Sequence, residues 1–304
     1  MYFRTIFVSI VMLVVMGAGC NSVPESSQGP KVAATIFPIY DLVRVVGGED
    51  VETVLVLPPG SSPHMFEPTP STIKDLQGAS LIFEVGHGLD SWVSSISASV
   101  PGLSRVVLDR AISLRMSDSL HEHEDMHHEE GEIHSHGLID PHYWLNPLNA
   151  SIMVDTVVHE LSQLVPERAD NFVRRATDFK DELARKNVEW ERMFGAISHK
   201  ELITFHDAFG YFADHFGLEI VSTVEPFPGK EPTPQYILHL KEEIEEHGVT
   251  VLYSEPQISL SALETFATDN ELSIAVLDPE GSGARSSYIE MIEYNVRTIV
   301  EHQQ

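Results

Sequence analysis

The stretch PERADNFVRRATDFKDELARKNVEWERMFGA occupies residues 166–196. Its only glycine is Gly195, near the end, and its large apolar residues recur at helical spacings. Pro166 suits the start of a helix, where its missing N–H leaves no hydrogen bond unmade. We therefore expect one long helix over 166–196, and the alternative is two shorter helices that belong to one lobe. The apolar residues in question are Phe172, Phe179, Leu183, Trp190 and Phe194.

On both sides of this stretch, short aliphatic runs alternate with helical ones. Before it, we expect strands at 31–36, 51–57, 79–85 and 105–108 and helices at 39–46, 71–77 and 89–98. After it, we expect strands at 201–205, 218–224, 249–253 and 273–277 and helices at 208–216, 234–247, 261–270 and 286–301. Such alternation is typical of a mainly parallel sheet with helices on both faces. The predicted fold is α/β, with lobes at 31–165 and 197–304 joined by one linking helix.

Length, composition and charge restrict the kinds of protein that this chain can be. A chain of 304 residues with 42% hydrophobic and 21% charged residues is long enough for two folded lobes. Its 19 basic and 46 acidic residues give a net charge of −27. Such a surface repels nucleic acid and anionic lipid, so we expect no nucleic-acid partner.

The N-terminus has the features of an export signal. Arg4 precedes an apolar run, Ile6–Met16, that is too short to span a bilayer comfortably, and small residues at 17–19 lead to Cys20. We predict a signal peptide over 1–19, lipidation of Cys20 and a flexible tether over 20–30. The alternative is an ordinary signal peptide followed by a chance cysteine. The mature protein would then be extracytoplasmic, either lipid-anchored or periplasmic.

Cys20 is the only cysteine, which excludes an intramolecular disulfide and a cysteine-based zinc site. Four other residues form a ligand set of three imidazoles and one carboxylate, which suits a tetrahedral zinc site. They are His64 in PPGSSPHMFEP (58–68), His142 in DPHYWLNP (140–147), His206 in TFHDAFGYFADHFG (204–217) and Asp278 in LDPEGSG (277–283).

Three of these four candidates follow predicted strands. His206 and Asp278 come directly after strands, and His64 follows one through a turn-rich loop. Ligands of open α/β sheets bind outside the carboxyl ends of the strands, so we expect an ion in the cleft between the lobes. Plainer roles stay open: Asp278 could be a turn former before a proline, and His206 could mark only a helix start. We expect no ligand role for His87, His159, His199, His215, His239, His247 and His302.

Residues 117–136, SDSLHEHEDMHHEEGEIHSH, form a polar insert that contains six of the 16 histidines. No hydrophobic period is present, so nothing here can join a core. We interpret the insert as a low-affinity metal collector, and the alternative is a solvated loop that binds metals incidentally. The match to H-E-x-x-H at 123–127 lacks the amphipathic helix that this motif requires, and we read it as a coincidence. The collecting residues would be His121, His123, His127, His128, His134 and His136.

Taken together, the motifs PHMFEP, DPHYWLNP, FHDAFGYFADHFGL and SEPQIS…LDPEG resemble those of the metal-binding (cluster A-I) substrate-binding proteins of ABC importers. The closer likeness is to the zinc-specific lipoproteins of that family, and it covers nearly all of the mature chain. The resemblance implies a metal site at the lobe interface with His64, His142, His206 and Asp278 as ligands, with water or an insert residue as the alternative to Asp278. It also implies delivery to a membrane permease.

The function expected from the sequence is high-affinity Zn²⁺ capture for an ABC permease by a monomeric, non-enzymatic protein. The family's manganese-type relatives carry glutamate where this chain has His206, and imidazole suits Zn²⁺ better than Mn²⁺. The alternatives are a manganese- or iron-type binding protein, a surface adhesin, and an extracellular zinc hydrolase with Glu67 or Asp207 as base.

Overall fold

The computed structural model describes residues 29–304 except 118–138, 226–228, 230–231, 258–259 and 284. The predicted signal peptide, Cys20, most of the tether and the histidine-rich insert therefore lie outside the described residues. Within the described part, no helix is both long and apolar enough to cross a membrane.

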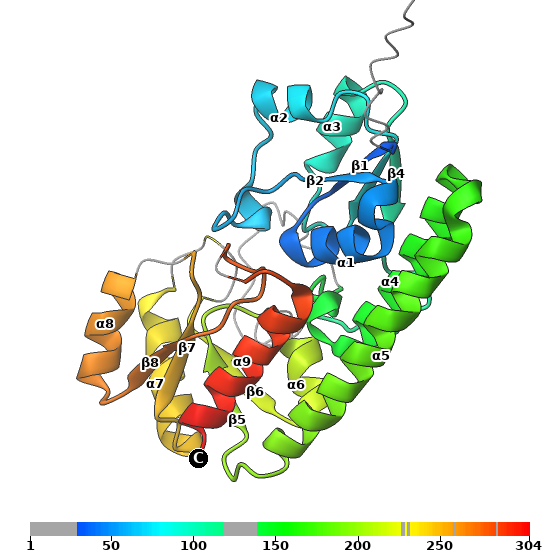
Figure 1. Cartoon of the computed structure of the whole chain (residues 1–304). Helices are drawn as coiled ribbons and strands as arrows, with labels where there is room; N and C mark the ends of the chain where they lie inside the picture. The colour runs from blue at the N-terminus through cyan, green and yellow to red at the C-terminus, as the bar shows by residue number, and fades with distance from the viewer. Residues whose placement is uncertain (1–28, 118–138, 226–228, 230–231, 258–259, 284) are drawn as a thin grey trace, which may run out of the picture.

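The N-terminal lobe is built on a four-stranded parallel sheet in the order β2-β1-β3-β4 (Figure 1). Its strands are β1 (Lys31–Ala34), β2 (Glu52–Leu55), β3 (Leu81–Glu84) and β4 (Ser104–Val107). Its helices are α1 (Phe37–Gly47), α2 (Pro70–Asp75), α3 (Val93–Ser99) and α4 (Pro147–Leu164), with short 3₁₀ turns at η1 (Gly48–Asp50), η2 (Pro63–Met65) and η4 (Tyr143–Leu145).

The C-terminal lobe repeats this plan, with a parallel sheet in the order β6-β5-β7-β8. Its strands are β5 (Glu201–Thr204), β6 (Glu219–Thr223), β7 (Val251–Ser254) and β8 (Ser273–Val276). Its helices are α6 (Gly210–Phe216), α7 (Pro234–His247), α8 (Leu260–Asp269) and α9 (Tyr288–His302).

Successive strand residues face opposite sides of each sheet, and both sides are covered. In β1, Val32 and Ala34 join the large core that α1, α4 and α5 help to form, whereas Ala33 joins the smaller core beneath α2 and α3. In β5, Leu202 and Ile203 divide in the same way between two cores. The predicted α/β architecture with two lobes is confirmed.

One long helix, α5 (Ala169–Phe194), runs beside both lobes in Figure 1. The prediction of a single linking helix is confirmed, with one change at its start. Val165 has a non-helical backbone conformation, and Pro166–Arg168 form a 3₁₀ turn, η5, before the α-helix begins. All five apolar residues that were predicted from the spacing are buried along α5. The boundaries 31–165, 166–196 and 197–304 remain our proposal for the division of the chain.

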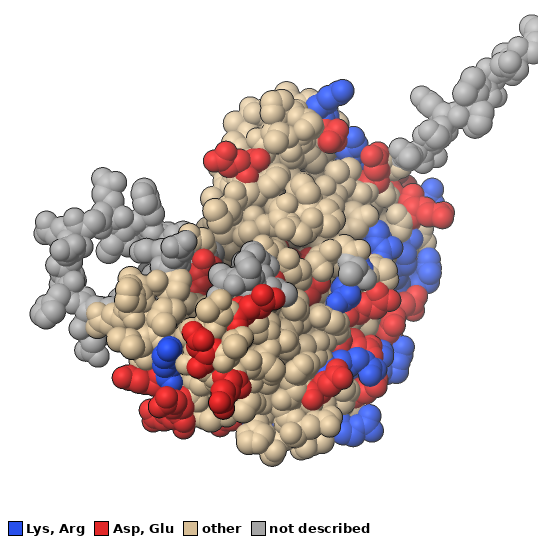
Figure 2. Space-filling view, turned by 90° about the vertical axis from the view of Figure 1, so that its left-hand side faces the viewer, with Lys and Arg blue, Asp and Glu red and all other residues tan. Residues whose placement is uncertain are grey.

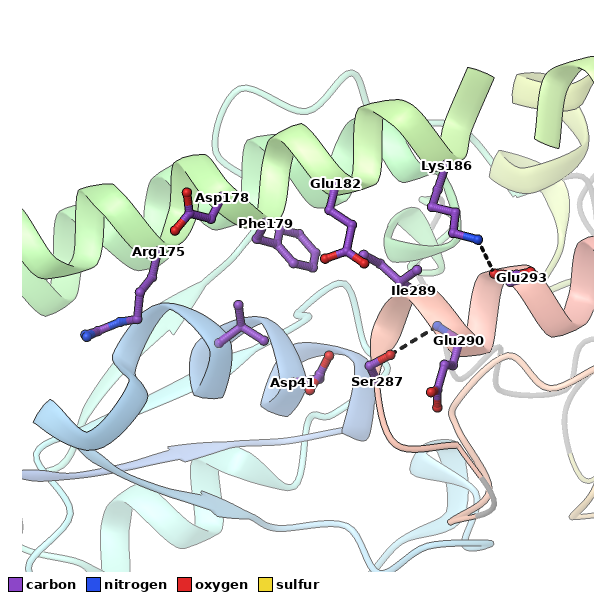
Figure 3. Close-up of a pocket in the computed structure, with 11 residues that line it drawn as sticks. Asp41, Arg175, Asp178, Phe179, Glu182, Lys186, Ser287, Ile289, Glu290 and Glu293 are labelled. Atoms are coloured by element: carbon purple, nitrogen blue, oxygen red, sulfur yellow. Dashed lines mark hydrogen bonds and ion pairs between the residues drawn. The ribbon is translucent and has the colours of Figure 1, made fainter. Parts of the chain in front are cut away.

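Helix α5 is tied to both lobes around an open groove of about 450 Å³ between α1, α5 and α9 (Figure 3). Arg175 of α5 donates to the carbonyls of Val46 and Gly47 at the end of α1. Lys186 of α5 pairs with Glu293 of α9 at 2.8 Å. These contacts attach α5 to one helix of each lobe, α1 and α9.

Candidate metal centre

His64 is presented by the loop after β2. It lies in the η2 turn, where the indole of Trp92 donates to the carbonyl of Pro63 at 3.0 Å. The rings of Phe66 and Trp92 meet edge to face, 4.8 Å apart. Trp92, at the start of α3, therefore anchors the short segment that carries His64.

His142 is held by the carboxylate of Asp140. Oδ1 of Asp140 lies 2.9 Å from both the backbone N and the Nδ1 of His142. Both residues are almost fully buried, and the ring of His142 packs 5.2 Å from that of Trp144. With Nδ1 bound to a carboxylate, the lone pair of His142 lies on Nε2.

His206 follows β5 by two residues, at the carboxyl end of the second sheet. Its Nδ1 lies 2.5 Å from Oε1 of Glu255, and both side chains are buried. Its Nε2 is also buried, and no described residue hydrogen-bonds to it. Because an unpaired buried polar atom is costly, this nitrogen needs another kind of partner.

The structure brings the three imidazoles together. One ligand atom from each of His64, His142 and His206 lies within 4.8 Å of the other two, and the ring centroids are 5.3–5.6 Å apart. Nε2 of His64 and Nε2 of His142 are 3.4 Å apart. Two nitrogens bound to one tetrahedral Zn²⁺ at 2.0–2.1 Å are about 3.3 Å apart, so the spacing already fits this ion.

Each lobe supplies part of this group. His64 and His142 come from the N-terminal side of α5, and His206 comes from the C-terminal side. Beside the centre, the indole of Trp144 donates to the carbonyl of Pro279 at 2.7 Å, and Tyr288 Oη donates to the carbonyl of Trp144 at 2.7 Å. The ligand loops of the two lobes are therefore in direct contact.

Asp278 does not belong to this group. Oδ1 accepts from the backbone N–H of Gly281 at 2.8 Å and of Glu280 at 3.3 Å. Oδ2 accepts from the backbone N–H and the hydroxyl of Ser282 at 2.8 and 2.9 Å. Both oxygens thus organise the loop 278–282, and the ligand role of Asp278 remains a prediction.

Two buried carboxyl groups lie near His206 that were not predicted as site residues from the sequence. They belong to Glu255 and Glu280. Glu255 directly follows β7, and Glu280 lies in the loop after β8, where Gln257 donates to it at 3.0 Å. The motifs SEPQ and LDPEG contain both residues, so the position after a strand could have identified Glu255. The charge of Glu280 also acts on His206.

These surroundings separate the proton affinities of the imidazoles. Burial and the neighbouring His206 lower the pKa of His142 to about 3. Burial opposes the charge on His206, but the charge of Glu255 and its hydrogen bond prevail and raise the pKa to about 9. Burial and the charge of Glu255 raise the pKa of Glu280 to about 8. A dication in the centre would replace the protons that this carboxylate-rich pocket attracts.

Two of the histidines for which no ligand role was expected have other partners. His87 pairs with Asp109 at 3.0 Å, and His215 with Asn187 at 2.7 Å. The six histidines of the insert, the H-E-x-x-H match at 123–127 and Cys20 fall outside the described residues, so their proposed roles stay predictions.

A model of the family described as zinc-uptake complex component A periplasmic, ZnuA, matches residues 32–302. The chain belongs to the ZnuA family. The high-affinity zinc uptake system protein ZnuA of Paracoccus denitrificans is 30% identical over 298 residues, which cover 91% of each chain. This match extends over both lobes and the linking helix.

Two further comparisons relate the ZnuA-family chain to known proteins. The zinc-binding protein AdcA of Streptococcus pyogenes serotype M3 is 29% identical over 287 residues, which cover 88% of this chain but 55% of AdcA. The chain thus spans about half the length of that relative. A crystal structure of a ZnuA superposes with a TM-score of 0.79 at 23% identity and covers 91% of this chain and 100% of the other, so the two share a fold.

Proposed function

We propose that this protein captures Zn²⁺ outside the cytoplasmic membrane and delivers it to an ABC permease. The observation that carries the proposal is the group of three imidazoles from two lobes, with one ligand atom of each within 4.8 Å of the others and with the Nε2 atoms of His64 and His142 at a spacing that suits Zn²⁺. The family description names a periplasmic zinc-uptake component, which supports the same function.

The donor set favours zinc over manganese. Three neutral imidazoles are borderline-soft donors, whereas Mn²⁺ prefers a larger share of carboxylate oxygen. We infer that His64, His142 and His206 bind the ion and that a carboxyl group of the loop 278–282, or a water, completes the tetrahedron. Asp278 is the residue predicted from the sequence, and Glu280 is the competing carboxyl group that the structure offers.

A binding role without catalysis follows from the enclosed surroundings. Two of the three imidazoles are at most 6% exposed, and a buried carboxyl group could fill the fourth position. A hydrolytic zinc site instead keeps an open position for water and substrate. We therefore place the protein among binding proteins rather than enzymes.

Capture from both lobes would let a permease recognise the loaded protein. The ion would bridge the ligand loops of the two lobes, so metal binding would favour one relative position of these loops. Lipidation of Cys20 would anchor the protein to the membrane, the protein would act as a monomer, and the insert at 117–136 would collect ions nearby. The acidic face in Figure 2, where Asp and Glu gather over the C-terminal lobe, suits cation capture better than nucleic-acid binding.

A competition titration tests this proposal. Protein purified without metal should bind one Zn²⁺ tightly, and Mn²⁺ should fail to displace it. In the source cell, deletion of the gene should impair growth at low zinc, with rescue by added zinc. A strain whose zinc requirement is unchanged would contradict transport and would favour a role such as adhesion.

A further inference from the structure

A second group of histidine and acidic side chains lies at the far end of the C-terminal lobe. A small pocket of about 50 Å³ is lined by His199, Glu201 and His247, together with Gln303 near the chain end marked C in Figure 1. Glu201 begins β5, whereas His206 follows its other end, so five residues of extended chain separate the two places by about 16 Å. This pocket is therefore distinct from the metal centre.

Glu243 places a carboxylate beside His247, one of the residues that line this pocket. Glu243 and His247 are four residues apart on α7 and so share one face of the helix. Nε2 of His247 lies 3.4 Å from Oε2 of Glu243, and Nε2 of His239, one turn earlier, lies 3.6 Å from Oε1. These distances exceed those of good N–H···O hydrogen bonds, which are about 2.7–3.2 Å. They are instead close to the edge of a tetrahedral zinc site, about 3.3 Å.

We propose that His199, Glu243 and His247 form a second, weaker binding site for a divalent transition-metal ion such as Zn²⁺. Imidazole and carboxylate are a donor set that such ions accept, and Glu201 adds negative charge beside them. Glu243 and His247 are partly buried with their donor atoms already adjacent, which supplies a chelating pair.

The weaker affinity follows from the lack of preorganisation. Among the described residues, only the three imidazoles of the metal centre have all ligand atoms within 4.8 Å of one another. His199 is exposed and must rotate to complete the second site. The resulting loss of side-chain freedom reduces the affinity. This site would fill only after the metal centre is saturated.

Residue-resolved chemical modification separates this site from the insert. The full chain, loaded first with one equivalent of Zn²⁺, is treated with diethylpyrocarbonate at increasing Zn²⁺, and each histidine is followed by peptide mass spectrometry. Coordination occupies the nitrogen lone pair that the reagent attacks, so the reactivity of His199 and His247 should fall at least about fivefold. His159, an exposed histidine on α4, should change little and serves as the reference.

The variant Glu243→Gln keeps the side-chain shape but removes the carboxylate, so its protection of His199 and His247 should be lost. The matched control Glu160→Gln, beside His159, should leave that protection intact. The proposal is overturned if His247 stays as reactive with Zn²⁺ as without it, if His159 is protected equally, or if Glu243→Gln changes nothing.

Discussion

Nδ1 of His206 and Oε1 of Glu255 lie 2.5 Å apart, and both side chains are buried. This contact joins residues that follow two neighbouring strands, β5 and β7. A carboxylate behind an imidazole fixes the ring orientation, directs the lone pair to the opposite nitrogen and raises its basicity. Glu255 is therefore a positioning residue of the metal centre that acts through the ring of His206.

Glu255→Gln tests this relationship. The glutamine carbonyl can still accept from Nδ1, but the negative charge is lost. We expect zinc affinity to fall about 10- to 100-fold while the fold is retained. Competition titration against a chelator measures the change, and Glu219→Gln, an exposed change on β6, is the control. Unchanged affinity in Glu255→Gln would show that the contact has no role in binding.

Proton release should accompany zinc binding. Because its pKa is raised to about 9, His206 carries a proton in the metal-free protein at neutral pH and must lose it to bind. At pH 7 we expect release of about one proton per ion from His206, with a second if Glu280 ionises beside the ion, and an affinity that rises until about pH 9. The ordinary pKa of histidine, about 6.5, would instead place this dependence at lower pH. Calorimetry in buffers of different ionisation enthalpy counts the protons, and none released would contradict the assignment.

The stability of the metal-free protein should peak at mildly acidic pH, because the raised pKa of Glu280 also gives stability that is lost as pH rises through about 8. The lowered pKa of His142 gives stability that is present above about pH 6.5 and is lost as pH falls toward 3. The raised pKa of His206 gives stability that is present below about pH 6.5 and is lost as pH rises through 9. Tm values measured by calorimetry should therefore fall at pH values both below and above this maximum. A steady rise of Tm to pH 9 would contradict these shifts.

Two isosteric changes distinguish the carboxyl groups of the loop after β8. Asp278→Asn places an amide against N–H donors, so we expect the free energy of unfolding to fall by about 1–3 kcal/mol with little change in zinc affinity. Glu280→Gln should lower zinc affinity at least about tenfold, because glutamine cannot lose a proton and so cannot place a negative charge beside the bound ion, as Glu280 can. The opposite pattern would identify Asp278 as the ligand. Chelator competition and urea unfolding measure the two quantities.

Deletion of 117–136 should leave the tight site intact and lower the total number of ions bound. Elemental analysis after dialysis against excess zinc gives the stoichiometry, and competition titration gives the affinity. Loss of tight binding would mean that the insert supplies a ligand.

Much of the fold and part of the site could be predicted from the sequence. Uninterrupted helical spacing from Phe172 to Phe194 predicted α5, since this signal is local. His64 and His206 were found because each follows a predicted strand at the carboxyl edge of its sheet, and His142 was found in a loop motif before a predicted helix. The role of Glu255 could not be predicted, because it depends on the pairing of β5 with β7, which brings together residues 49 positions apart. Asp278 was predicted as a ligand from its position after a strand. That position did not reveal that backbone N–H groups already donate to its carboxylate.

Zinc K-edge X-ray absorption on protein loaded with less than one equivalent of Zn²⁺ tests the central claim most directly. We predict three imidazole nitrogens at about 2.0–2.1 Å and one further oxygen ligand, with one imidazole lost in His206→Ala. A spectrum with fewer than two imidazoles, or one that His206→Ala leaves unchanged, would contradict a site built from His64, His142 and His206.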